Sequence, residues 1–260
     1  MSRGFGVAAG LDPGVASPLA GRCQELGYAS IWSNDHPGAK GLDTLADFAR
    51  GADRIELGVG VIALDRHEPA AIAADLERTG LDRERIWLGV GAGFTKKPLT
   101  TMREALPTLR EQLPGVRLVL AAMGPKMCAF AGAEWDGVFF NWMTPEYAQV
   151  AREHAEAGAA DAGREPPPVM GYVRTAVGSG SERRLAKEEA FYRDLHKGYR
   201  DHFDRLGEPE GTVGVAAENA GEAQTELSRY RALDTVVVRA LASATIEDMS
   251  AVAEAAAPGA

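Results

Sequence analysis

Short runs of apolar residues, many of them β-branched, alternate along the chain with longer amphipathic segments. These runs are apolar at all but one or two positions, as strands that are buried on both faces should be. The segments between them are rich in Ala, Leu, Glu and Arg at helical spacing. The runs predict eight strands, at residues 4–9, 29–33, 55–63, 86–91, 116–122, 137–142, 169–177 and 235–241.

Strands that alternate with helices predict parallel βαβ units. Eight such units in 260 residues match the size of a (β/α)8 TIM barrel. A doubly wound sheet is the competing arrangement, but eight units without an evident domain break favour a closed barrel. We therefore predict an α/β fold with a single TIM-barrel domain over residues 1–260.

One predicted helical segment, residues 181–206, is longer than a barrel helix needs. Such a segment either packs along the barrel or lets one end overhang the mouth and cover a pocket, and the sequence leaves both arrangements open. Its apolar stripe at helical spacing consists of Phe191, Leu195, Tyr199, then His202 or Phe203, and Leu206.

The composition is that of an ordinary globular protein, with 45% hydrophobic and 25% charged residues. The formal net charge is -9 and the basic residues are scattered, so we expect neither nucleic acid nor a membrane as a partner. The two cysteines are far apart and the five histidines are dispersed, which predicts no disulfide and no metal site. Without signal-peptide or membrane-spanning character, we expect a soluble, cytoplasmic protein.

The chemistry of a TIM barrel lies where the strands end and the βα loops begin. At the end of the second strand, the stretch IWSNDHP passes from apolar residues into Asp35 and His36. A histidine can gain or lose a proton near neutral pH, so we predict His36 as the general acid or base. A structural hydrogen bond into the rim is the alternative. Arg66 and His67 follow the third strand; they are second-rank candidates for this role, and we expect them rather in rim salt bridges or an interface.

Two more arginines lie in predicted strands, Arg174 in the seventh and Arg239 in the eighth. Arg174 either binds an anionic substrate or pairs with a buried acid inside the barrel. The sequence favours neither of these roles.

The glycines at strand ends lack the G-x-G-x-x-G spacing of a dinucleotide-binding motif. A glycine such as Gly91 instead permits the close approach of a flat ligand. In AAMGPKM (121–127), Gly124 and Pro125 suit a strand-to-helix turn that points free amides at the rim. This turn is either a phosphate cradle at a helix N-terminus or a plain connection.

Four segments, in this order, carry a resemblance to a known family. They are ELGYASIWSNDHP (25–37), RIELGVGVIALDRHEPAAIAADLE (54–77), RERIWLGVGAG (83–93) and AAMGPKMCAFAGAEWDGVFFNWMTPE (121–146). The chain resembles the luciferase-like flavin- and deazaflavin-dependent oxidoreductases, in the branch that uses coenzyme F420. The family has a (β/α)8 barrel, in agreement with the alternation described above.

The resemblance implies that a cofactor ring lies across the C-terminal mouth of the barrel. It implies that Asp35 contacts this cofactor and that His36 stands beside the reacting centre. It also implies a cis peptide bond at Gly60–Val61 against one ring face, and a phosphate held by the backbone after the fifth strand. The predicted cofactor-binding residues are Asp35, Gly60, Val61, Gly91, Ala122, Met123, Gly124 and Pro125.

The chain departs from part of the family pattern. Some members carry a catalytic glutamate just after the glycines of the fourth strand, where this chain has Phe94. The tryptophan that some members have shortly after the histidine is also missing, since Gly38 and Ala39 occupy those positions after His36. These departures argue against a sugar phosphate as the substrate and for a more apolar pocket.

We therefore expect an oxidoreductase that transfers a hydride between coenzyme F420 and a small, fairly apolar organic substrate at the barrel mouth. An FMN-dependent monooxygenase is the first alternative, because both cofactors present a flat tricycle and a phosphate. A cofactor-poor binding or accessory protein is the second alternative. Family habit implies a homodimer or a higher homo-oligomer.

Overall fold

The computed structural model describes residues 1–259 and contains one parallel sheet of nine strands. The strand order is β6-β5-β4-β3-β2-β1-β9-β7-β8, and a further pairing of β6 with β7 closes eight strands into a barrel. The strands are β1 (Ser2–Val7), β2 (Ser30–Ser33), β3 (Glu56–Ala63), β4 (Ile86–Gly91), β5 (Arg117–Ala121), β6 (Gly137–Asn141), β7 (Val169–Val177), β8 (Val215–Ala217) and β9 (Thr235–Ala240).

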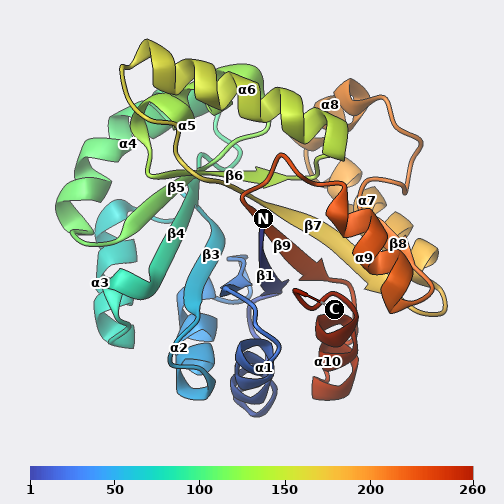
Figure 1. Cartoon of the computed structure of the whole chain (residues 1–260). Helices are drawn as coiled ribbons and strands as arrows, with labels where there is room; N and C mark the ends of the chain where they lie inside the picture. The colour runs from blue at the N-terminus through green and yellow to red at the C-terminus, as the bar shows by residue number, and fades with distance from the viewer. Residues whose placement is uncertain (260) are drawn as a thin grey trace.

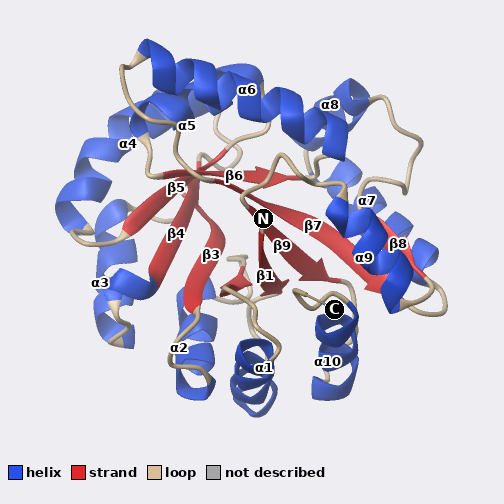
Figure 2. Ribbon diagram, viewed as in Figure 1, coloured by secondary structure: helices blue, strands red, loops and turns tan. Residues whose placement is uncertain are grey.

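Helices connect the strands and surround the sheet, as Figures 1 and 2 show. They are α1 (Pro13–Glu25), α2 (Gly41–Gly51), α3 (Pro69–Thr79), α4 (Pro98–Gln112), α5 (Pro125–Glu134), α6 (Pro145–Asp161), α7 (Ser181–Leu195), α8 (Lys197–Leu206), α9 (Ala220–Ser228) and α10 (Ile246–Ala255), with a 3-10 turn at Arg83–Arg85. Five of the helices, α1, α3, α4, α5 and α6, have Pro at their first turn, where a missing N–H costs no hydrogen bond. None of the helices in residues 1–259 is both long enough and apolar enough to span a membrane.

Large side chains fill the interior of the barrel. They come from alternate positions of the strands, because successive residues of a strand face opposite sides of the sheet. The interior cluster consists of Trp32, Val119, Phe139, Met170, Tyr172 and Val237. The predicted (β/α)8 barrel and its eight strands are confirmed.

The structure corrects two details of the prediction. Residues 181–206 form two helices and not one extended helix, because His196 has extended backbone angles (φ -161°, ψ 146°). The His196 Nδ1 atom accepts the amide of Gly198 at 2.9 Å and so caps the start of α8. The short strand β8, which pairs with the end of β7, was not predicted either, because three residues between two helices give too weak a pattern.

A bulge interrupts β3 near the mouth of the barrel. The register with β4 shifts between Val59 and Ile62, and the Gly60–Val61 peptide bond is cis. Gly89 of β4 lies against the bulge, where a Cβ atom would overlap the carbonyl oxygen of Val59. The predicted cis bond is therefore confirmed, and glycine at position 89 is needed to make room for it.

Two glycines allow α5 and α6 to pack closely. A Cβ atom on Gly132 of α5 would overlap the carbonyl of Ala155, and one on Gly158 of α6 would overlap the carbonyl of Ala129. This crossing fixes α5, whose N-terminus lies at the mouth after β5.

We expect Gly132→Ala to lower the free energy of unfolding by about 2 kcal/mol, despite the better helix propensity of alanine, because its methyl group must push the two helices apart. Gly221→Ala is the control, since its methyl group would meet only the Asn219 side chain, at 3.3 Å. It should be neutral or slightly stabilising. Urea denaturation of both variants measures the difference, and equal stability of the two would contradict the close packing.

Candidate functional site

Asp35 follows β2 and lies under the rim, with its side chain 2% exposed. Its Oδ1 atom accepts hydrogen bonds from Arg66 Nη2 at 3.2 Å and His67 Nε2 at 2.9 Å, and its Oδ2 atom accepts the Gly41 amide at 3.2 Å. The carboxylate thus joins the loops after β2 and β3 to the first residue of α2. The rim salt bridge expected for Arg66 is present, while the contact of Asp35 with a cofactor stays a prediction.

His36 lies in the next position, partly exposed, in a tight loop where it forms a β-bridge with Ala39. Its Nδ1 atom accepts the Gly38 amide at 3.1 Å, which places the proton of the neutral ring on Nε2. The Nε2–H group faces the carbonyl oxygen of Ala9 at 3.3 Å, a long hydrogen bond. The imidazole is therefore held in one tautomer, with its N–H group at the rim, and a better-placed acceptor can replace the Ala9 carbonyl.

The bulge of β3 and the end of β4 form one wall of the mouth. Gly60 rests on the interior aromatic residues, since a Cβ atom there would lie 2.8 Å from Phe139 and 3.0 Å from Tyr172. The half-buried Val61 lies against Gly91, where a Cβ atom would be 3.1 Å from its Cγ2 atom. Because Gly91 has no side chain, this wall can accept a flat ligand close to the backbone.

The turn from β5 to α5 offers free backbone donors. The amide of Ala122 donates to the carbonyl of Phe139 at 3.1 Å, whereas the amides of Met123 and Gly124 make no hydrogen bond within the described residues. Nothing lies within 4 Å of a Cβ atom placed on Gly124, and Pro125 begins the helix. Two free amides at a helix N-terminus fit a phosphate group.

The wall and the turn belong to the same rim. One strand, β4, separates β3 from β5, so the two features lie roughly 10 Å apart at the usual strand spacing. A cofactor with a flat ring and a phosphate on a short side chain fits such an arrangement. Gly60, Val61 and Gly91 would hold the ring, and Met123 and Gly124 would hold the phosphate.

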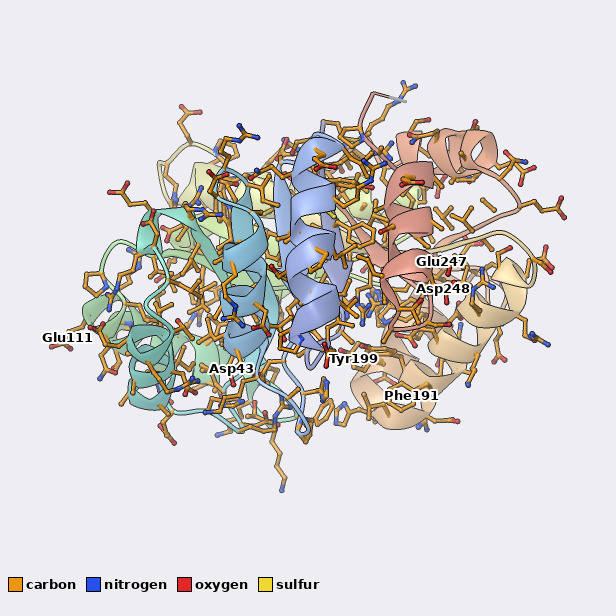
Figure 3. All side chains as sticks on the ribbon, turned by 90° about the horizontal axis from the view of Figure 1, so that it is seen from below. Asp43, Glu111, Phe191, Tyr199, Glu247 and Asp248 are labelled. Atoms are coloured by element: carbon orange, nitrogen blue, oxygen red, sulfur yellow. The ribbon has the colours of Figure 1, made fainter. Side chains whose placement is uncertain are left out.

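The helix pair α7–α8 covers part of the mouth. The ring of His196, between the two helices, stacks on Phe94 of the loop after β4, with ring centroids 4.3 Å apart. The Phe94 amide is held by Asp65 Oδ2 at 2.9 Å. Figure 3 shows Phe191 of α7 and Tyr199 of α8 at the same end of the barrel as Asp43 near the start of α2.

A buried hydrogen bond between His202 and the backbone of Trp142 could not be predicted from the sequence. Trp142, just after β6, has a positive φ of 56°, which is uncommon for a residue other than glycine. The Nε2 atom of His202 donates to its carbonyl oxygen at 2.7 Å, and burial lowers the pKa of His202 to about 4. The position of His202 in an amphipathic stripe does not indicate this contact, because Trp142 follows a strand that is distant in the sequence.

Metal chemistry has no support in the side-chain arrangement. No group of three or more His, Cys, Asp or Glu side chains in residues 1–259 is placed to hold a metal ion.

Replacement of Asp35 tests its role at the rim. We expect Asp35→Asn to lower the free energy of unfolding by about 2 kcal/mol at pH 7, because the buried carboxylate loses its charge-assisted bonds to Arg66 and His67. Asp43→Asn is the matched control, since the Asp43–Arg78 pair is half-exposed. It should cost less than about 0.5 kcal/mol. Chemical denaturation would contradict this role if the two variants lost equal stability.

The low pKa of His202 makes stability depend on pH. Above pH 6.5 the ring is neutral in both the folded and unfolded states. Between pH 6.5 and about 4 only the unfolded state takes up the proton, so the stability should fall as the pH falls, by about 3 kcal/mol in total. His202→Gln keeps an N–H donor for the Trp142 carbonyl and should lose this part of the pH dependence. An unchanged slope in that variant would show that another group titrates.

Comparison with known proteins agrees with the fold. A curated relative, the 5,10-methylenetetrahydromethanopterin reductase of Methanolobus tindarius, is 28% identical over 181 residues, which cover 56% of this chain and 56% of the relative. The chain thus matches about half the length of this relative.

Two solved structures match over almost the whole chain. The coenzyme F420-dependent tetrahydromethanopterin reductase of Methanopyrus kandleri has a TM-score of 0.76 at 17% identity and covers 99% of this chain and 97% of its own. An F420-dependent secondary alcohol dehydrogenase, solved with an F420–acetone adduct, has a TM-score of 0.74 at 17% identity and covers 98% of both chains. At these identities the matches establish the fold.

The sequence profile described as luciferase-like monooxygenase matches residues 100–257, which is more than half of the chain. This match includes the turn from β5 to α5, the helix pair α7–α8, and the strands β7 and β9. The chain belongs to the luciferase-like monooxygenase family, as its sequence pattern predicted.

Proposed function

We propose that the protein is an F420-dependent oxidoreductase that transfers a hydride between this deazaflavin and a small organic substrate at the C-terminal mouth of the barrel. One observation carries the proposal. The wall formed by the β3 bulge and Gly91 lies at the same rim as the free amides of Met123 and Gly124, two strands away, as a ring and a phosphate require. The names of the relatives favour F420 as the cofactor.

The bound cofactor supplies or accepts the hydride, and the protein supplies alignment and proton management. When a substrate carbonyl or imine carbon gains a hydride, its oxygen or nitrogen needs a proton. His36 can give this proton from Nε2 in its doubly protonated form, in which Nδ1 also carries a proton and no longer accepts the Gly38 amide. In the reverse reaction, the neutral ring with its proton on Nδ1 takes up a proton at Nε2.

Asp35 has a supporting role in this proposal. Its bonds to Arg66, His67 and the Gly41 amide fix the loop that carries His36. The two residues are adjacent, so a shift of the Asp35 carboxylate moves the imidazole. We also propose, from family habit, a homodimer or a higher homo-oligomer in the cytoplasm.

An FMN-dependent monooxygenase is the second candidate, favoured by the description of the family that matches residues 100–257. Both cofactors fit a flat wall and a phosphate cradle. A cofactor-poor accessory protein is the third candidate, and the absence of a glutamate at Phe94 speaks for it. It would bind neither cofactor.

The reaction itself tests the proposal. Purified protein should oxidise reduced F420 in the presence of a ketone, imine or enone from a substrate panel, as followed by the return of the deazaflavin absorbance. Oxidation that requires oxygen and reduced FMN in place of reduced F420 would move the protein to the monooxygenase candidate.

Replacement of His36 separates proton transfer from binding. We expect His36→Ala to lower kcat by about 100-fold or more, while the dissociation constant of F420 changes less than about threefold. His154→Ala is the matched control, since this half-buried histidine lies well inside α6 and outside the loops that carry His36 and His67. Steady-state kinetics and a cofactor titration measure both quantities. A loss of F420 affinity with kcat unchanged would contradict the assigned role.

A further inference from the structure

Two arginines lie side by side at the mouth end of the barrel interior. Arg174 of β7 is 2% exposed and Arg239 of β9 is 8% exposed, and the two residues are register partners in the parallel sheet. Two residues earlier in the same strands, Tyr172 and Val237 fill the interior. Since side chains alternate along a strand, both arginines point to this same inner side, one layer nearer the mouth.

The positive charge of this pair is not balanced by a carboxylate ion pair among the described residues. Within residues 1–259, no carboxylate forms an ion pair with either side chain. Arg174 Nη1 donates to Asn141 Oδ1, and Arg239 Nη1 donates to the carbonyl of Ala240 at 3.2 Å. The other N–H groups include the buried Nε of Arg174, which has no hydrogen-bond partner among the described residues. The second role considered for Arg174, pairing with a buried acid, is therefore not found.

The electrostatic surroundings of Arg239 also disfavour its positive charge. Burial lowers the pKa of Arg239, and the positive charge of Arg174 lowers it further. The carboxylate of Glu188 on α7 acts on the pKa of Arg239 in the opposite direction, but its effect is weaker than that of burial and of the Arg174 charge. Two buried like charges without a counter-charge are unfavourable, so an anion that joins them gains a strong interaction.

The rest of the cluster is organised to hold these charges in place. The guanidinium of Arg174 lies 4.2 Å from the ring centre of Trp142 and 5.0 Å from that of Tyr192. Cation–π contacts orient a guanidinium but leave its charge and most of its donors available. His202 in turn holds Trp142 in its uncommon backbone conformation.

Hydroxyl donors complete the cluster. The Tyr172 hydroxyl is buried and has no hydrogen-bond partner among the described residues. Burial raises the pKa of Tyr199 to about 12, so its hydroxyl keeps its proton near neutral pH, beside the side chain of Asn141. The cluster thus presents N–H and O–H donors and a net positive charge to a ligand at the mouth of the barrel.

We propose that Arg174 and Arg239, with the Tyr172 hydroxyl, form a subsite for a carboxylate group of the substrate. This inference rests on the proposed function in one respect, namely that the anion belongs to the molecule that exchanges the hydride. β7 is four strands from β3 in the closed ring, so the arginine pair faces the Gly60–Val61 wall from the opposite side. The substrate expected from the sequence, a small and fairly apolar molecule, is thereby refined to an apolar body with one acidic group.

The first test measures anion binding to the cofactor-free protein. Benzoate and its neutral analogue benzamide are titrated at constant ionic strength, with tryptophan fluorescence as the readout, because Trp142 touches Arg174. Benzoate should bind saturably and benzamide at least tenfold more weakly. Equal binding of the two, or no saturable binding of benzoate, would overturn the proposal.

Variants of the two arginines locate the site. Arg174→Met and Arg239→Met should each weaken benzoate binding at least tenfold. Arg103→Met, which removes one positive charge from the exposed face of α4, should leave it within twofold of the parent. If a methionine variant does not fold, the corresponding lysine variant keeps the charge without the planar fork, and it should still weaken benzoate at least threefold. Unchanged binding in the folded variants would overturn the proposal.

Thermal unfolding separates a binding role from a structural one. Because each methionine removes an unpaired buried charge and keeps apolar length, Arg239→Met should unfold at the same temperature as the parent or higher. Benzoate should raise the unfolding temperature of the parent and not that of the variant. A variant that unfolds well below the parent, together with the same benzoate shift in both proteins, would show that the arginines are structural.

Titration of the same variants with F420 distinguishes this proposal from the proposed function. The dissociation constant of F420 should stay within about threefold of the parent value, because the phosphate cradle lies after β5. Variants that lose F420 and not benzoate would assign the arginines to the cofactor and overturn the proposal, while F420 use would stand. A parent that selects benzoate over benzamide but binds no F420 would leave the anion subsite standing without the proposed function.

Discussion

Parallel pairing of eight strands in a closed ring is the constraint on which the rest of this structure depends. All strands run in one direction, so all their carboxyl ends meet at one rim. Residues that are far apart in the sequence, such as His36, Val61, Gly124 and Arg174, therefore come to one mouth. The closure is completed by the pairing of β6 with β7 and of β1 with β9. Small local exceptions, above all the β3 bulge, then shape this rim.

The charged groups of the rim fall into two kinds. Asp35 is buried, and both of its carboxylate oxygens accept hydrogen bonds from the protein. Arg174 and Arg239 are also buried, but each has one hydrogen-bond acceptor among residues 1–259, and the buried Nε of Arg174 has none. A satisfied buried charge stabilises the loops that it joins, whereas an unsatisfied one is retained at a cost in stability. Natural proteins accept such costs mainly where function requires them.

Much of this architecture could be predicted from the sequence, because a closed parallel barrel has a strong periodic pattern. Continuously apolar runs, such as 4–9 and 86–91, marked the sheet, and polar residues after the strands marked the rim. The cis bond at Gly60–Val61 came from the resemblance to the family, since no local pattern specifies it. The break at His196 was missed because the stripe of α7 and α8 continues through it.

The arrangement of side chains inside the mouth could not be predicted. Asp35 and His36 are neighbours in the sequence, but the sequence does not show that the Asp35 carboxylate accepts hydrogen bonds from Arg66 and His67. Likewise, Arg174 and Arg239 are 65 positions apart by their numbers, and only the register of β7 and β9 makes them neighbours. Support such as that of Trp142 by His202 depends on packing between distant elements, for which a single sequence carries no signal.

A parallel titration of the cofactor-free protein with F420 and with FMN would decide which cofactor this mouth binds. Equilibrium dialysis reports both dissociation constants without any assumption about the substrate. We expect saturable binding of F420, at least tenfold tighter than that of FMN. Tighter binding of FMN would contradict the assignment of the cofactor, and binding of neither would contradict the assignment of this mouth as an oxidoreductase site.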